Sequence, residues 1–208
     1  MAEYHKYIFD TDKREFVGSF ENMYQHETKV NFDSWHQEDS RQLNRKIALA
    51  ILEEWNFQTI IDVGAGKGTL THLLKKRNNQ VVGLDVSSTA VEMAKARFQD
   101  IEFDVVDVND VGKVHEYCAS RSEKWGGVDL VFTSECLSYL RNWREFLHTV
   151  SHHARFLLVS LYIPEDPIGF VKSSDILEAE ISCHFDLIES VRLTKSRFIV
   201  IFAKSHAI

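Results

Sequence analysis

A glycine-rich segment carries the clearest chemical signal in the sequence. It runs from Ile60 to Thr69 and reads Ile-Ile-Asp-Val-Gly-Ala-Gly-Lys-Gly-Thr. A short apolar stretch, Thr59–Val63, leads into the glycines, and a helical pattern follows them. Glycines between a strand and a helix let the backbone turn tightly and approach a ligand that a Cβ atom would repel. The segment therefore predicts a ligand-binding loop at the carboxyl end of a strand.

Two carboxylates accompany this loop at positions that indicate a nucleoside-bearing cofactor. Asp85 ends the next apolar stretch, 21 residues after Gly64, which is the spacing of an acid that accepts both hydroxyls of a ribose. Asp62 stands two residues before Gly64, where it would repel a pyrophosphate and attract a cation. The dinucleotide fingerprint needs a glycine at position 69, which is Thr69 here. S-adenosyl-L-methionine, which carries an ammonium and a sulfonium but no phosphate, fits both acids.

The elements that must position these residues alternate between strand and helix patterns. Several strand stretches are apolar throughout, which is typical of parallel strands buried on both faces, and their alternation with helices indicates βαβ units. We expect an α/β fold: a doubly wound, mostly parallel Rossmann-like sheet with helices on both faces and a C-terminal antiparallel hairpin. Strands are expected at residues 59–63, 80–84, 101–106, 128–133, 156–161, 185–193 and 198–203. Helices are expected at 40–55, 69–77, 89–98, 112–124 and 142–152, with Ser40 as an N-cap and a Thr89/Glu92 capping box.

The start of the chain differs from this pattern. Residues 1–39 are polar and aromatic with poor periodicity, and they include Phe16, Phe20 and Trp35. Large apolar side chains left in water forgo about 1.5–3 kcal/mol each. We therefore expect a helical, aromatic arm at 1–39 that folds as a lid over a cofactor-binding domain at 40–208.

The chain resembles the class I S-adenosylmethionine-dependent methyltransferases. Asp62–Gly68 is similar to the family's D/E-x-G-x-G-x-G signature, and Asp85 matches its acidic residue after the second strand. Asp107 matches the acid after the third strand, which usually meets the adenine amino group. Val128–Leu140 resembles the fourth strand and the following segment, whose backbone lies beside the sulfonium. The resemblance covers about residues 40–203, and its finer details look most like small-molecule members, including nodulation-type N-methyltransferases that act on sugar amines.

The resemblance assigns roles residue by residue. It implies that Asp62 contacts the methionine end of the cofactor, directly or through water, and that Asp85 holds the ribose. Val86 and Val108 are either apolar walls of the adenine slot or plain core. The implied cofactor-binding set is Asp62, Gly64, Ala65, Gly66, Asp85, Val86, Asp107, Val108 and Ser134.

Candidates for a catalytic base are His36, Glu135 and Tyr162. A hydroxyl acceptor would need such a base within hydrogen-bond reach, whereas an amine that loses its proton before binding would not. Cys136 is expected to be structural, because the cysteine nucleophile of cytosine-C5 methyltransferases follows a proline and Cys136 follows Glu135. The loop 162–169 is expected either to border the acceptor pocket or to be a simple crossover.

The composition of the chain indicates which classes of binding partner to expect. The 24 Lys and Arg residues against 31 Asp and Glu give a net charge of −7, which disfavours phosphate backbones and anionic membranes. The three cysteines form no CxxC pair, so neither a zinc site nor a disulfide framework is predicted. No apolar run reaches about 18 residues, and the N-terminal segment lacks an apolar signal core. We expect a cytoplasmic monomer or homodimer that takes a small-molecule acceptor and no nucleic acid, membrane or metal.

Together these patterns predict an enzyme that moves a methyl group from S-adenosyl-L-methionine to a nitrogen or oxygen of a small metabolite, such as a saccharide or an amine. Two alternatives remain open. One is an inactive S-adenosylmethionine-binding partner or sensor. The other is an NAD-dependent oxidoreductase, which Asp62 and Thr69 disfavour.

Overall fold

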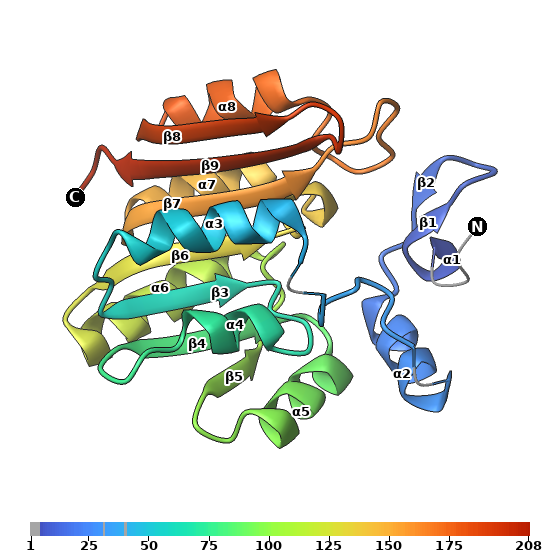
Figure 1. Cartoon of the computed structure of the whole chain (residues 1–208), viewed down its shortest axis with the longest axis horizontal. Helices are drawn as coiled ribbons and strands as arrows, with labels where there is room; N and C mark the ends of the chain where they lie inside the picture. The colour runs from blue at the N-terminus through green and yellow to red at the C-terminus, as the bar shows by residue number, and fades with distance from the viewer. Residues whose placement is uncertain (1–4, 31, 40) are drawn as a thin grey trace.

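A seven-stranded sheet organises the structure, a computed structural model that describes residues 5–30, 32–39 and 41–208. The strands are β3 (Thr59–Val63), β4 (Gln80–Asp85), β5 (Glu102–Val105), β6 (Val128–Ser134), β7 (Ala154–Tyr162), β8 (Phe185–Leu193) and β9 (Phe198–Ser205). Their order is β5-β4-β3-β6-β7-β9-β8 (Figure 1). The first five are parallel, whereas β9 runs antiparallel to both β7 and β8. The expected fold class, including the C-terminal hairpin, is confirmed.

Helices cover both faces of this sheet. They are α3 (Leu43–Glu53), α4 (Thr69–Leu74), α5 (Ser88–Arg97), α6 (Val111–Trp125), α7 (Trp143–Ser151) and α8 (Ser174–Ser182). Ile60 joins a core cluster that includes residues of α3 and α4, and its neighbour Ile61 joins a cluster with residues of α6, α7 and α8. Successive strand residues point to opposite faces, so the unbroken apolar character of β3 reflects burial on both sides. In Figure 1, α3 and α4 lie in front of the sheet.

Two helices differ from their expected ranges by more than one residue at an end. The helix predicted at 69–77 ends at Leu74, because the Asn79 side chain accepts a hydrogen bond from the Lys76 amide (2.7 Å) and donates to the Leu74 carbonyl (2.9 Å). These bonds replace the next turn of helix. The helix predicted at 40–55 is α3, which begins at Leu43 and ends at Glu53. The expected N-cap, Ser40, lies outside the described residues.

The capping-box prediction is wrong, and one helix was missed. Ser87 caps α5 by accepting a hydrogen bond from the Ala90 amide (3.1 Å), while the Thr89 hydroxyl donates to Glu21 of the N-terminal region (2.6 Å). The carboxylate of Glu21, which is distant in the sequence, therefore takes the place of the expected local partner, Glu92. Helix α8 was not predicted. It begins with Ser173 as N-cap, and its buried face rests on Leu177 and Ile181, too few apolar positions to stand out as a periodic pattern.

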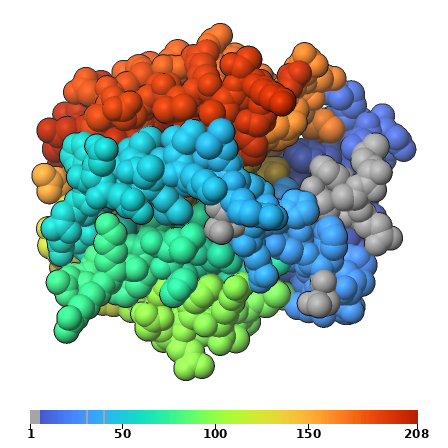
Figure 2. Space-filling view, viewed as in Figure 1, coloured from blue at the N-terminus to red at the C-terminus, as the bar shows by residue number. Residues whose placement is uncertain are grey.

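The N-terminal region packs beside the carboxyl edge of the sheet. It contains α1 (His5–Ile8), a two-stranded antiparallel ribbon of β1 (Phe9–Asp10) and β2 (Glu15–Phe16), and α2 (Phe20–Val30). We call residues 5–39, as far as they are described, the arm. Its buried residues Ile8, Met23 and Tyr24 form a cluster with Ala90 of α5. Figure 2 shows the arm, in blue, against the orange connection between β7 and α8.

Gly68 and Gly126 provide a matched test of packing in this fold, because both have a φ of +79°. A Cβ atom on Gly68 would lie 2.6 Å from Cζ of Phe103 and 3.1 Å from Cβ of Ala94, whereas one on Gly126 meets no described atom within 4 Å. Both alanine variants share the backbone strain, but only Gly68→Ala overpacks the core. We expect it to lose about 1–3 kcal/mol more unfolding free energy than Gly126→Ala in urea titrations. Equal losses would contradict this packing.

Candidate functional site

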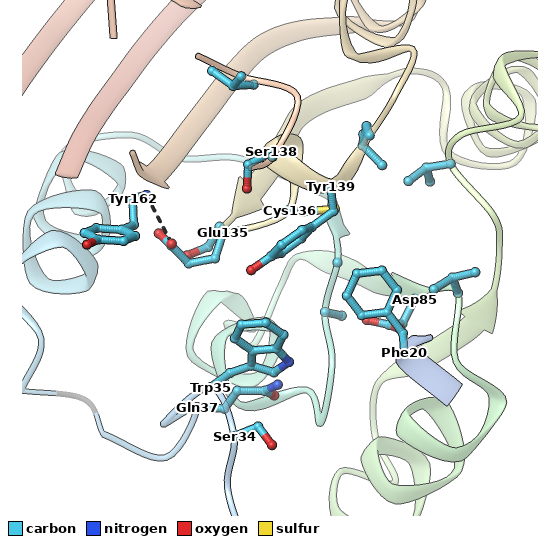
Figure 3. A pocket seen from close by; sticks show the side chains of 18 of the residues that line it. Phe20, Ser34, Trp35, Gln37, Asp85, Glu135, Cys136, Ser138, Tyr139 and Tyr162 are labelled. Carbon is cyan, nitrogen blue, oxygen red and sulfur yellow. Dashed lines mark hydrogen bonds between the residues drawn. The ribbon is translucent and has the colours of Figure 1, made fainter. Parts of the chain in front are cut away.

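A cavity of about 550 Å³ opens at the carboxyl edge of the parallel strands, next to the arm. This volume falls within the range of about 300–1,000 Å³ that is common for small-molecule sites. Its lining comes from the glycine loop, the ends of β4 and β6, the arm, and the connection between β7 and α8. The cavity is therefore bordered by segments that are far apart in the sequence. Figure 3 shows part of this lining.

Backbone hydrogen bonds fix the glycine loop against the end of β4. The amides of Gly64 and Ala65 both donate to the Leu84 carbonyl, at 2.8 and 2.9 Å. The Gly66 amide donates to Oδ2 of Asp85 (2.9 Å), and Oδ1 of Asp85 accepts from the Ser87 amide (2.9 Å). A carboxylate has about four acceptor positions, so Asp85 can still accept hydrogen bonds from a ligand in the cavity. Burial raises its pKa above the ordinary aspartate value.

Asp62 forms a second, more deeply buried acid at the same edge. It is 2% exposed and accepts a hydrogen bond from the Thr71 hydroxyl at 2.6 Å. Burial raises its pKa to about 7, and the charge of Asp85 acts in the same direction. A cation placed beside it would favour the carboxylate again. Both acids therefore suit a ligand that brings positive charge and hydroxyl groups together.

The remaining predicted cofactor residues also line the cavity, except Gly66, which lies beneath two arm side chains. A Cβ atom on Gly66 would lie 2.4 Å from Nε2 of Gln37 and 2.7 Å from the Tyr24 hydroxyl. Val86 is 44% exposed, a large fraction for a valine at a strand end, and Val108 is buried. The lining residues of the predicted set are Asp62, Gly64, Ala65, Asp85, Val86, Asp107, Val108 and Ser134.

Glu135 is held in an unusual backbone conformation at the end of β6. Its φ is +61°, a left-handed value that few non-glycine residues adopt and that is often found at functional sites. Its amide donates to the Ser160 carbonyl (2.8 Å), and its Oε2 accepts from the Tyr162 amide (3.1 Å). The other oxygen, Oε1, is buried without a hydrogen-bond partner among the described residues. Burial raises the pKa of Glu135 to about 8, although the Tyr162 amide and the charge of Arg45 oppose this shift.

The structure brings two of the three predicted catalytic residues together and leaves the third apart. Tyr162 is joined to Glu135 through its amide, and its ring packs against Phe198 with centroids 5.3 Å apart. His36 is exposed on the arm, where it borders both the main cavity and an outer hollow. Within the described residues, no hydrogen bond joins His36 to Glu135 or Tyr162. Cys136 packs against Gly64, and burial raises the pKa of its thiol to about 12, so it is not a ready nucleophile.

Aromatic side chains of the arm gather around Tyr139, in the short 3-10 turn Leu137–Tyr139 that follows β6. The Tyr139 ring lies 5.6 Å from Trp35, 5.3 Å from Phe20 and 5.9 Å from Phe9, centroid to centroid. Figure 3 shows Glu135 between Tyr162 and Tyr139, with the Trp35 ring below them. One part of the cavity therefore combines a buried carboxyl group with aromatic walls.

Sequence reasoning missed the residues that join the arm to the glycine loop. Lys67, inside the loop, is 7% exposed, and its Nζ lies 3.1 Å from Oε2 of Glu27 and 2.8 Å from Oδ1 of Asp33. Gln37 accepts a hydrogen bond from the Lys67 amide (2.7 Å) and donates to the Tyr24 hydroxyl (3.0 Å). A lysine among glycines was the available signal, but its acidic partners are 34 and 40 residues away in the sequence.

Comparison with known proteins agrees with this geometry. A family model described as a methyltransferase domain matches residues 61–155. This range contains most of β3, all three glycines of the loop, and both Asp85 and Glu135. The match spans slightly less than half of the chain. Residues 61–155 are therefore similar to a methyltransferase domain, and the fold of the chain is that of a SAM-dependent methyltransferase of known structure.

The individual proteins that this chain is similar to are distant in sequence. Putative methyltransferase 235L of Invertebrate iridescent virus 6 is 25% identical over 116 residues, which cover 55% of this chain and 40% of that protein. The chain thus matches less than half the length of this curated relative. A SAM-dependent methyltransferase from Anabaena variabilis ATCC 29413 is similar with a TM-score of 0.70 and 12% identity, over 90% of this chain and 93% of the other. The N-terminal domain of EvdMO1, solved with SAH bound, has a TM-score of 0.58 and 16% identity, over 79% and 82% of the two chains.

The described residues contain neither a metal-binding cluster nor a membrane-spanning helix. In the described part of the chain, no group of three or more His, Cys, Asp or Glu side chains is arranged to hold a metal ion. Across the same residues, no helix is both long enough and apolar enough to span a bilayer.

The raised pKa of Glu135 predicts a pH-dependent difference in stability. An unfolded glutamate has a pKa near 4.5 and the folded residue about 8, so between these values the folded state holds a proton that the unfolded state has lost. Stability contributed by this group therefore falls as pH rises through that window. Urea titrations at about pH 5 and about pH 8.5 measure the unfolding free energy of the parent and of Glu135→Gln. The value for the variant minus that for the parent should be larger at the higher pH by at least about 1.4 kcal/mol, the equivalent of one pKa unit. Glu165→Gln, with a side chain 84% exposed, is the control and should show no such gain.

The Lys67 contact predicts strong coupling between the loop and the arm. Lys67→Met leaves the buried carboxylate of Glu27 without its cation, which should lower the unfolding free energy by about 3–5 kcal/mol. The double variant Lys67→Met/Glu27→Gln should recover part of that loss, because the uncompensated charge is gone. Lys95→Met, which breaks an exposed pair with Glu92, should cost at most about 1 kcal/mol. Strictly additive losses in urea titrations would show that Lys67 and Glu27 do not act as a pair.

Proposed function

We propose that this chain binds S-adenosylmethionine at the glycine loop and transfers its methyl group to a nitrogen or oxygen of a small metabolite. The observation that carries the proposal is the continuity of the cavity. A single space of about 550 Å³ reaches from the glycine loop and Asp85 at one side to Glu135 and Tyr162 at the other. Donor and acceptor could therefore meet within it, away from bulk water.

The residues around the glycine loop fit the chemistry of the donor. Asp85 keeps acceptor capacity for ribose hydroxyls after its two backbone hydrogen bonds. Asp62 supplies negative character for a cationic amino-acid end, and the exposed face of Val86 suits an adenine ring. The Ser134 hydroxyl is buried and has no hydrogen-bond partner among the described residues, so it also has capacity for a ligand.

When bound, this donor supplies a methyl group that its sulfonium already activates. The main tasks of the protein are then to orient the acceptor and to keep water out. Near-attack positioning of this kind can lower a barrier by about 7–11 kcal/mol. The acceptor atom, the methyl carbon and the sulfur would have to lie in line within the cavity. The ends of strands β4 and β6 form part of the walls that would hold this alignment.

The arm supports the second task. We propose that it acts as a lid, since Lys67 and Gln37 attach it to the glycine loop and a 2.7 Å ion pair between Arg14 and Asp166 attaches it to the β7–α8 connection. Such attachments on two sides of the cavity would limit entry of water during the reaction. They also favour a small acceptor over a polymer, because the arm spans the space above the loop.

Among the predicted bases, Glu135 has the position that suits proton transfer. Its Oε1 is buried at the cavity and without a partner in the described structure, and its raised pKa allows it to hold a proton at neutral pH. Tyr162 contributes its amide to the orientation of that carboxyl group. His36, which is exposed, is better placed at the entrance than at the reacting atoms.

A radiolabelled methyl-transfer screen over amines, saccharides and carboxylic acids tests the proposal. We expect transfer to at least one amine or saccharide, with label that stays on the small molecule after protein removal. Binding of S-adenosylhomocysteine without transfer to any class would instead favour the inactive binding partner. Binding of NAD in place of S-adenosylhomocysteine would favour the oxidoreductase.

Asp85→Ala should weaken donor binding. Loss of charge-assisted hydrogen bonds worth about 1.5–3 kcal/mol each, partly replaced by water, predicts a dissociation constant for S-adenosylhomocysteine that is about ten- to a hundredfold higher. Isothermal titration measures this constant, and a thermal melt checks that the variant is folded. Asp186→Ala, at an exposed position on the edge strand β8 that does not line the cavity, is the control. An affinity within about twofold of the parent would contradict the role of Asp85 in holding ribose.

A further inference from the structure

Once the donor-side acids are assigned, one carboxyl group in the cavity has no ligand group assigned to it. The carboxyl groups among the lining residues are those of Asp62, Asp85, Asp107, Glu135 and Asp166. The first three border the donor side, and Asp166 is exposed and paired with Arg14. Glu135 is left, at the far side of the cavity from Asp85.

The charge of Arg45 acts on Glu135, but most of its hydrogen bonds are made elsewhere. The Arg45 guanidinium lowers the pKa of Glu135, yet its Nη1 and Nη2 donate to the carbonyl groups of Trp35, His36, Gln37 and Asp39, and its buried Nε has no hydrogen-bond partner among the described residues. Among the described residues Glu135 itself forms no ion pair, and its Oε1 has no hydrogen-bond donor. A buried carboxyl oxygen that lacks a donor can be satisfied by a ligand group that brings one.

The surroundings of Glu135 indicate which group that is. Tyr162, Tyr139 and Trp35 are placed around it (Figure 3), and aromatic faces attract cations, most strongly where water is excluded. Among the described lining residues the basic side chains are those of Arg45 and His36, against five carboxyl groups. The charge of the cavity as a whole therefore disfavours anionic acceptors. A neutral hydroxyl could use the carboxyl group but would gain nothing from the aromatic faces or from the net negative charge.

We propose that the acceptor is a cationic amine on an apolar, ring-sized body, with its nitrogen bound by Glu135 between the Trp35, Tyr139 and Tyr162 rings. This inference rests on the proposed function. The ammonium favours the carboxylate form of Glu135, because opposite charge offsets the effect of burial. Glu135 is then both the anchor of the acceptor and the group that receives its proton.

The proposed reaction is balanced in atoms and charge. One proton of the ammonium passes to the Glu135 carboxylate, which frees the nitrogen lone pair. That lone pair forms the new bond to the methyl carbon, and the carbon–sulfur bond of the donor breaks with both electrons left on sulfur. The positive charge thus moves from sulfur to the methylated nitrogen, and Glu135 later releases its proton to solvent as the product leaves.

The test compares matched amines and alcohols in binding, without turnover. The full chain is saturated with S-adenosylhomocysteine, which has no methyl group to give. Calorimetry then measures three pairs of probes: benzylamine and benzyl alcohol, 2-phenylethylamine and 2-phenylethanol, and cyclohexylamine and cyclohexanol. We expect at least one amine to bind about tenfold or more tightly than its alcohol, as one charge-assisted hydrogen bond predicts. A protein that binds S-adenosylhomocysteine but prefers no amine overturns this inference alone, whereas absence of S-adenosylhomocysteine binding contradicts the proposed function.

Variants test whether the preference for the amine depends on Glu135. Glu135→Gln keeps the size of the side chain and should reduce the preference for the amine to about twofold or less, with unchanged affinity for S-adenosylhomocysteine. Glu165→Gln, an exposed glutamate on the adjoining connection, should keep the full preference. Trp35→Leu is the second variant and should lower amine affinity about threefold or more while alcohol affinity changes less. A preference that survives in both Glu135→Gln and Trp35→Leu would overturn the assignment.

Discussion

The hydrogen bond between the Gly66 amide and the Asp85 carboxylate is the interaction on which the site depends. Together with the bonds from Gly64 and Ala65 to the Leu84 carbonyl, it fixes the glycine loop against the neighbouring strand. The loop can follow this path because its glycines adopt left-handed backbone angles. The same carboxylate faces the cavity. The geometry of the loop and the proposed recognition of the donor therefore depend on one side chain, which itself is held by the parallel register of β3 and β4.

The arm extends this arrangement to the acceptor side. Its residues 33–37 contact the glycine loop through Asp33 and Gln37, and between them Trp35 meets Tyr139. Arg45 stabilises this segment by bonding to its backbone carbonyl groups. A short stretch of chain thus touches both halves of the cavity, so closure over the donor and formation of the aromatic wall are expected to occur together.

The sequence predicted what depends on local pattern and failed where distant partners decide. Apolar strands, alternating helices and the glycine spacing determine the fold, and Asp62, Asp85 and Val86 line the cavity, although their predicted role in binding the cofactor stays a prediction. The Thr89 capping box failed because Glu21, 68 residues away, bonds to that hydroxyl. The surroundings of Glu135 could not be predicted from local sequence either. Its left-handed backbone and its unpartnered Oε1 depend on strand β7 and on the packed arm, which are distant in the sequence.

The position of Trp35, two residues from Gln37, has a consequence for how acceptor range can diverge among related proteins. Under the proposed function, substitutions in this part of the arm should change the affinities for donor and acceptor together, so selection for a new acceptor there would also disturb the donor. Most of the connection from Pro164 to Gly169 also lines the cavity, and its contacts include Ser138, Arg197 and Arg14 at the tip of the arm. Changes of acceptor should therefore accumulate in that connection, while residues 33–37 drift more slowly.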